Sequence, residues 1–166
     1  MIIRMKKQIL MMALVGFLFV ANSATAQTKV GAFFGYGTEV EQLGIGGIGE
    51  FSLNSKWAIS PSLLFYFPEK NGNIKTSFFE FNANANYFFL AQNSVNLYGL
   101  AGINYFRGKV KNTDTDDSYT GDEVGVNIGI GANFNTKSNI VPFGEMKFVL
   151  GDADQLALFF GVKFKL

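Results

Sequence analysis

The amino-acid sequence predicts an all-β protein, an eight-stranded antiparallel up-and-down transmembrane β-barrel. Eight segments alternate between apolar and small or polar residues with a period of two, which is typical of strands. Most of them approach ten residues, or about 33 Å, which crosses the hydrocarbon of a bilayer when the strand is tilted by ~45°. Longer and shorter connections largely alternate, as in barrels with short periplasmic turns and longer outer loops.

The connections follow the strands in a regular order. Short polar turns follow the second, fourth and sixth expected strands, and longer connections follow the first, third and fifth. The connection from Gly108 to Asp122 is the longest and most charged, whereas the connection over 151–154 is short. The expected strands are 29–36, 44–53, 56–67, 77–89, 95–107, 123–135, 140–150 and 155–166.

The N-terminal segment has the features of an export signal. A basic start with Arg4, Lys6 and Lys7 precedes the apolar run 9–20, and Ala24-Thr25-Ala26 has the small-residue pattern of a cleavage site. An uncleaved anchor is the alternative, but the run is shorter than the about 20 residues of a spanning helix. The sequence therefore predicts a cleaved signal peptide over 1–26 and one domain over 27–166.

Composition excludes several functional classes. Removal of 1–26 takes away three of the 14 basic residues and none of the 13 acidic ones, so the net charge changes from +1 to −2. This near balance gives no support for a nucleic-acid partner. The sequence contains no Cys and no His, which removes thiolate chemistry and the commonest general base and metal ligand. We expect no cofactor and no catalytic or metal site.

The polar face of the strands decides which side of the barrel meets lipid. In a soluble lipocalin-like barrel, the apolar face would line the interior and a face rich in Lys and Glu would meet water. Here the polar face is mostly Asn, Gly, Ser and Ala, which suits a narrow, crowded lumen. Aromatic residues near the strand ends, Phe88 and Phe106 among them, are expected to form interfacial girdles.

Charges of both signs also fall on this polar face. An unpaired buried charge is costly, so acids and bases inside a lumen need one another. We therefore favour a structural network that fills the barrel over the alternatives, a gate or a catalytic pair of carboxylates. The expected lumen residues are Glu50, Glu80, Asn82, Asn84, Asn86, Asn127, Asn133, Glu145, Lys147, Lys163 and Lys165.

The loop from Gly108 to Asp122 is the best candidate for contact with an external partner. Its acidic stretch resembles a hard-cation site in composition but lacks the spacing of an EF-hand loop. Weak calcium binding remains an alternative to a solvated outer loop. The candidate contact residues are Arg107, Lys109, Lys111, Asp114, Asp116, Asp117 and Tyr119.

Taken together, the export signal, the eight two-residue-period strands, the alternating connections and the C-terminal segment resemble the small eight-stranded outer-membrane β-barrels of Gram-negative bacteria, the OmpA/OmpX-like family. The C-terminal segment Gly161-Val-Lys-Phe-Lys-Leu166 resembles the family's insertion signal, although Leu166 replaces the usual terminal aromatic residue.

The resemblance implies a non-enzymatic integral protein of the bacterial outer membrane. Its expected partners are outer-membrane lipid, the barrel assembly machinery through the C-terminal strand, and an external molecule at the outer loop. A structural or cell-surface interaction role is the leading interpretation. A small porin or channel, or an exported lipocalin-like soluble ligand binder, is the alternative.

Overall fold

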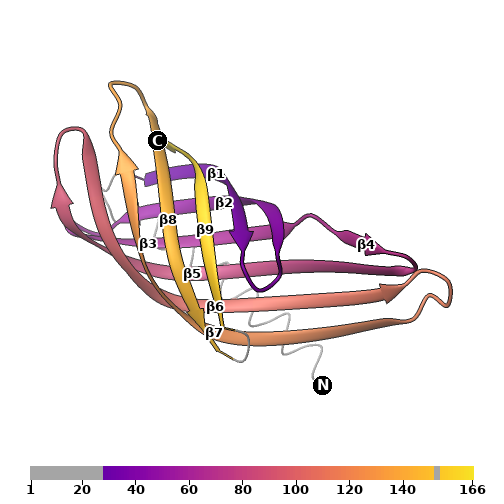
Figure 1. Cartoon of the computed structure of the whole chain (residues 1–166). Coiled ribbons are helices and arrows are strands. Elements are labelled where there is room, and N and C mark those ends of the chain that lie inside the picture. Colours follow the sequence, from indigo (N-terminus) through magenta and orange to yellow (C-terminus); the bar gives the residue numbers. More distant parts are fainter. Residues whose placement is uncertain (1–27, 152–153) are drawn as a thin grey trace, which may run out of the picture.

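The computed structural model describes residues 28–151 and 154–166, and the predicted signal peptide lies outside this part of the chain. The described residues form one antiparallel sheet that closes on itself (Figure 1). No helix in them is long and apolar enough to cross a membrane. The strands are β1 Thr28–Gly37, β2 Gln42–Ser52, β3 Trp57–Tyr66, β4 Glu69–Asn71, β5 Ile74–Ala91, β6 Val95–Asn112, β7 Ser118–Phe134, β8 Ile140–Leu150 and β9 Gln155–Lys165.

Two pairings close the barrel, one between its first and last strands and one across the short strand β4. β1 pairs with β9, so that Val30 lies opposite Phe164, and β3 pairs with β5, so that Ser62 lies opposite Asn82. β4 is a three-residue extension that pairs only with β5 and lies outside this ring. The remaining eight strands form the ring, which confirms the predicted eight-stranded antiparallel up-and-down barrel.

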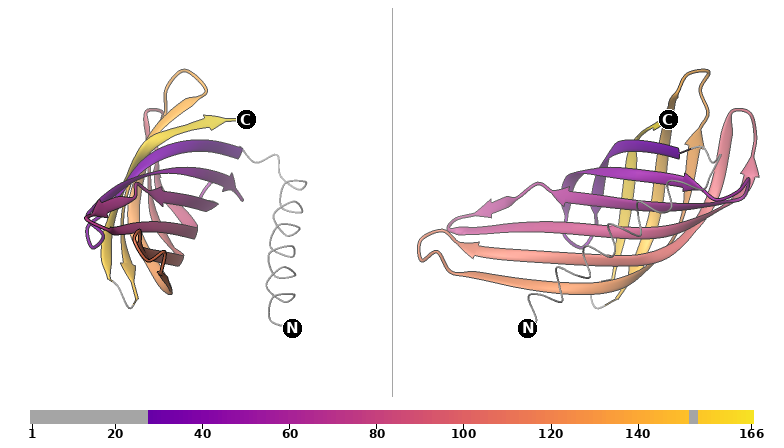
Figure 2. Two further views of the ribbon diagram at one scale, coloured as in Figure 1. Left: turned by 90° about the vertical axis from the view of Figure 1, so that its right-hand side faces the viewer. Right: turned by 180° about the vertical axis from the view of Figure 1, so that it is seen from behind.

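Strands β5, β6 and β7 are longer than predicted. They have 18, 18 and 17 residues, whereas the other five strands of the ring have 10 or 11. Figure 1 and the right-hand view of Figure 2 show their ends running past the neighbouring strands together with β4. The prediction that Gly108 to Asp122 forms a loop is therefore wrong. The residues on both sides of the tip continue the β6–β7 ladder, with Val110 opposite Tyr119. Only Thr113 to Asp117 form the turn.

The apolar face of the strands points outward and the polar face inward. On β7, Val124 and Ile128 are 72% and 55% exposed, whereas the intervening Asn127 is fully buried. An exported soluble binder of the lipocalin type would place its apolar side chains inside instead. The soluble alternative is therefore wrong for this barrel.

Small residues make room for the few large side chains in the lumen. A Cβ atom on Gly131 would lie 2.3 Å from Cζ of Tyr98, and one on Gly46 would lie 2.4 Å from Cζ of Phe33. Both rings are buried, and the Phe33 ring stacks on that of Phe159 at 4.4 Å between centroids. Glycine on the polar face thus serves close packing inside the barrel.

The expected girdle position of two aromatic residues is wrong. The Phe88 ring packs against the buried Tyr98 ring at 5.1 Å, and the Phe106 ring stacks on Phe78 at 5.3 Å. Phe88 and Phe106 each lie two residues after a buried Asn, Asn86 and Asn104, so the alternation of β5 and β6 points both rings inward.

Candidate functional site

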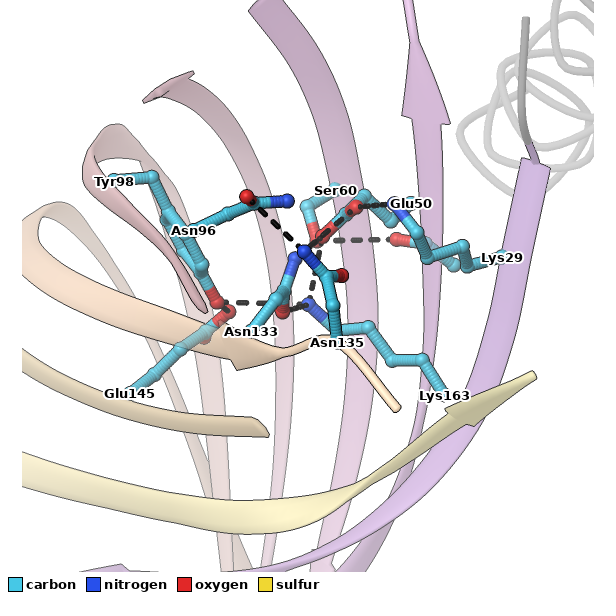
Figure 3. Close-up of polar contacts among 10 residues, drawn as sticks. Lys29, Glu50, Ser60, Asn96, Tyr98, Asn133, Asn135, Glu145 and Lys163 are labelled. Carbon is cyan, nitrogen blue, oxygen red and sulfur yellow. Dashed lines mark hydrogen bonds and ion pairs between the residues drawn. The ribbon is translucent and has the colours of Figure 1, made fainter. Parts of the chain in front are cut away.

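The lumen holds two clusters of buried polar side chains. The cluster nearer the chain termini is centred on the Glu50 carboxylate of β2, which is fully buried. Lys29 of β1 donates to its Oε1 at 2.5 Å, and Lys163 of β9 donates to its Oε2 at 2.7 Å (Figure 3). Asn133 Nδ2 also donates to Oε2, at 3.1 Å. One carboxylate thus joins side chains from three other strands.

The same cluster extends to a second carboxylate. The Tyr98 hydroxyl donates to Glu145 Oε1 at 2.7 Å, which connects β6 to β8 across the lumen (Figure 3). Lys163 donates to Asn133 Oδ1 at 3.0 Å and lies 4.3 Å above the Phe143 ring. The ammonium group therefore has a carboxylate, an amide and an aromatic face as neighbours, which together offset its desolvation.

The second cluster lies farther along the barrel and is centred on Glu80 of β5. Lys147 of β8 donates to Glu80 Oε1 at 2.8 Å and to Asn82 Oδ1 at 2.6 Å. The Tyr66 hydroxyl donates to Glu80 Oε2 at 2.8 Å. Both charged side chains are fully buried, so this ion pair is shielded from water on all sides.

Asparagine side chains extend this cluster across β5, β6 and β7. Asn104 and Asn127 each donate to Asn82 Oδ1 at 2.9 Å, and Asn127 also donates to Asn84 Oδ1 at 2.8 Å. Asn86 differs from them. Its side chain is buried, but its amide has no hydrogen-bond partner among the residues in the structure.

The structure thus gathers ten of the eleven predicted lumen residues as buried side chains. Lys165 is the exception, because it is half-buried at the end of β9 and its side chain contacts no acid in the described barrel. The prediction missed Lys29, Tyr66, Tyr98 and Asn104. Lys29 and Asn104 fall in the two-residue series of the inward face of their strands, so the alternation could have identified them. The two tyrosines resembled core aromatic residues.

The lumen is filled rather than open. Phe33, Phe143 and Phe159 occupy the space with the two clusters, and Lys147 Nζ lies 4.3 Å above the Phe159 ring. A pocket at the mouth, lined by Asn104 and Gln155 among others, has a volume of about 20 Å³. This volume is of the order needed for a single water molecule. The side chains described in the lumen can hold strands together, and no group of three potential metal ligands occurs in the described chain.

The outer part of β6 and β7 forms a charged hairpin, which contains the predicted contact residues. Arg107 donates to both oxygens of Asp122, at 2.5 and 3.0 Å. Lys111 lies 2.5 Å from Asp116, and its hydrogen bond lowers the pKa of the Asp116 carboxyl below its ordinary value. Tyr119 is 77% exposed, and Lys109 is also exposed.

The tip of this hairpin is joined to the neighbouring turn between β4 and β5. The backbone N–H and the hydroxyl of Thr113 both donate to the carbonyl of Asn73, at 2.8 and 3.1 Å. The Asn73 side chain donates to Asp114, and the Asn112 N–H closes the tip by donating to the Asp117 carbonyl at 2.9 Å. The β6–β7 tip and the β4–β5 turn thus hold each other in place through these hydrogen bonds.

Comparison with known proteins identifies the family. A family model described as the outer membrane protein beta-barrel domain matches residues 10–141. The chain belongs to this family. As a member of it, the protein resides in the bacterial outer membrane, with its outward apolar face in lipid. The search of curated proteins found no match.

Solved structures of other proteins share the fold at low sequence identity. Ail, the attachment invasion locus protein of Yersinia pestis, is 18% identical with a TM-score of 0.63, over 85% of this chain and 97% of Ail. The N-terminal β-barrel domain of Pseudomonas aeruginosa OprF is 17% identical with a TM-score of 0.67, over 84% and 97% of the chains. A major outer membrane protein of Thermus thermophilus is 11% identical with a TM-score of 0.70, over 86% and 100% of the chains.

Proposed function

We propose that the protein is a non-enzymatic component of the outer membrane that contributes to the envelope structurally and contacts other molecules through its outer hairpin. The observation that carries the proposal is the contrast between a filled lumen and a tied, charged hairpin that runs past the barrel. A filled lumen leaves the exterior surface as the part of the molecule that other molecules can reach.

The outer hairpin has the properties of a contact surface. Its β6–β7 ladder continues to Lys111 and Ser118, and its tip is fixed by Asn73. A fixed tip loses little conformational entropy on binding. The exposed Tyr119 offers the amphipathic ring that is enriched at interfaces. Ail, which shares this fold, is named for attachment and invasion.

A porin role is the weaker candidate. Eight strands leave an interior that side chains fill, and here Glu50, Glu80 and their lysine partners occupy it. The buried clusters therefore favour a closed barrel over a conducting one.

We also propose no enzymatic role for the lumen carboxylates. The lumen carboxylates Glu50 and Glu80 are held by lysines, and Glu145 is held by Tyr98. The whole sequence has neither His nor Cys to activate a nucleophile.

Two further roles belong to the ends of the chain. We expect residues 1–26 to direct export and to be removed, and the strand β9 to be recognised by the barrel assembly machinery. Phe160, Val162 and Phe164 alternate on the outer face of β9, as an insertion signal requires, with Leu166 at the terminus.

A shortened hairpin tests the surface role. In the test variant, residues 110–119 are replaced by Asn-Gly, which joins the cross-strand pair Lys109 and Thr120 in a two-residue turn. A matched control replaces the turn at 136–139 at the other end of the barrel. Cells lacking the protein are complemented with each form, and attachment to host-cell or matrix surfaces and sensitivity to detergent are measured.

The two readouts separate the two parts of the proposal. We expect the shortened form to restore detergent resistance but not attachment, and the control to restore both. Full attachment by the shortened form, at equal amounts in the outer membrane, would overturn the surface role. Unchanged detergent sensitivity in cells lacking the protein would overturn the envelope role.

A further inference from the structure

The outward face of the strand ends at β4, β5 and β6 carries a concentration of basic side chains. Lys70 lies directly opposite Lys75, and Lys75 lies directly opposite Lys111. Directly opposite residues of an antiparallel pair share a face, and like charges in this arrangement repel. Three lysines in one cross-strand row therefore destabilise the sheet unless an anion lies against them.

Two more cations continue this face toward the barrel. Lys109 pairs with Ser77, and Arg107 pairs with Phe79, so both lie in the same two-residue series as Lys111. Asp116 and Asp122 pair with Lys111 and Arg107, which leaves five basic side chains against two acidic ones. We call the set Lys70, Lys75, Arg107, Lys109 and Lys111 the basic face.

An apolar groove lies immediately beside the basic face. It has a volume of about 450 Å³, and Phe65 and Phe67 in its wall are 56% and 50% exposed. The groove occurs where the chain leaves β3 after its last pair with β5, Phe65 opposite Phe79. Its lining includes Ile45, Phe65, Phe67, Phe79, Arg107 and Lys109.

The position of the groove relative to the membrane fixes the kind of molecule that reaches it. The outward residues of β5 are apolar from Phe89 up to Phe79 and then change to Ser77 and Lys75. The apolar band of the barrel therefore ends at the groove, where lipid headgroups meet the hydrocarbon. The long strand ends lie opposite the short turns, so this is the outer leaflet.

We propose that the groove and the basic face together bind a phosphate-bearing lipid of the outer leaflet. An acyl chain lies along Phe65, Phe67 and Phe79, and the phosphate contacts Lys109, Lys75 and the guanidinium of Arg107. The lipid's negative charge offsets the repulsion in the lysine row, which no acid on the described face fully offsets. This site is on the wall of the barrel, and it does not depend on a surface role for the hairpin tip.

The test measures binding of a phosphomonoester lipid to the full-length barrel in nanodiscs of phosphatidylcholine. Dilauroyl phosphatidic acid is titrated, and protein-bound lipid is counted by native mass spectrometry. The test variant is Lys75→Gln with Lys109→Gln, and the matched control is Lys56→Gln with Lys137→Gln, two exposed lysines at the turn end of the barrel. Removal of two cations near a lipid surface is expected to weaken binding about 30-fold, whereas the control should bind as the wild type does.

A third variant, Phe67→Ala, tests the groove separately from the charges. We expect weaker binding of phosphatidic acid with no change in the stability of the barrel, because Phe67 lies beyond β3 and is half exposed. Equal binding by the two double variants would overturn the proposal.

Two competitors identify the source of the phosphate. Glycerol 1-phosphate carries the headgroup without chains, and dextran sulfate represents a soluble polyanion. We expect neither to displace the lipid at equal concentration of anionic groups. Complete displacement by glycerol 1-phosphate would show that a free phosphate suffices, and preferential binding of dextran sulfate would show a glycan site instead. Either result would overturn the lipid assignment.

Discussion

The ammonium group of Lys147 lies 2.8 Å from the carboxylate of Glu80 although β6 and β7 separate their strands in the sheet. Both side chains are fully buried, so the pair crosses the lumen instead of following the ladder. Removal of one partner leaves an uncompensated buried charge. We expect Glu80→Gln alone to lower the free energy of unfolding by about 3–5 kcal/mol.

The double variant Glu80→Gln with Lys147→Met serves as the control for this pair. It removes both charges, so it should recover most of the lost stability. Urea titration in phosphatidylcholine vesicles, followed by the electrophoretic shift between folded and heat-denatured forms, gives both values. A double variant as unstable as the single one would contradict a role in charge compensation.

Two glycines of β6 provide a matched test of packing in the barrel wall. A Cβ atom on Gly102 would lie 2.2 Å from the Ala83 carbonyl oxygen, whereas one on Gly99 would meet nothing within 4 Å. Gly102→Ala should therefore cost about 1–3 kcal/mol through overpacking. Gly99→Ala should be neutral or slightly stabilising in the same urea titration. Similar values for both would argue against the close approach of β5 and β6.

Neighbouring positions on β5 test which face meets lipid. Ala83 lies on the outward face, so Ala83→Arg should cost about 2–4 kcal/mol near the middle of the bilayer. Asn84 points inward and accepts a hydrogen bond from Asn127. Asn84→Ser should cost only about 1 kcal/mol, because a hydroxyl can accept the same bond. Equal tolerance at the two positions, measured by folding yield and urea midpoint in vesicles, would contradict the orientation.

The filled lumen predicts a very low conductance. Lys163, Glu50 and Phe143 are buried and pack together in the cluster near the termini. We expect purified, refolded protein in planar bilayers to stay near background at moderate voltage. Large, long-lived conductance steps at single-protein density would support a channel instead.

Much of the barrel could be predicted from the sequence because one face of every strand is in lipid. The alternation in Phe81-Asn-Ala-Asn-Ala-Asn86 fixes the orientation of β5, since a shift by one residue would expose every Asn to hydrocarbon. Glu50 and Glu80 lie on the inward face that the same alternation predicts. The individual partners were not predictable, because the sequence carries no information on which distant strands face each other.

The strand ends beyond the membrane were predicted poorly. At the outer ends of the two strands, after Gly108 on β6 and before Asp122 on β7, both faces meet water, so polar residues occur on both and the alternation disappears. The charges of Lys109 and Lys111 looked like those of a loop, although they pair across strands with Thr120 and Ser118. The inward position of Phe88 follows from the same alternation, because Phe88 continues the series of Asn82, Asn84 and Asn86; its aromatic type and its place near the strand end suggested a girdle instead.

Two ion pairs of the lumen also connect the two halves of the sequence. Glu50 and Glu80 belong to the N-terminal half, and their partners Lys163 and Lys147 belong to the C-terminal half. Lys29 pairs with Glu50 within the N-terminal half, but a half-formed sheet that entered the bilayer alone would carry Glu80, or Lys147 and Lys163, unpaired into hydrocarbon, at a cost of several kcal/mol for each ion. The network therefore opposes insertion of incomplete barrels, and it couples entry into the membrane to the meeting of the first and last strands.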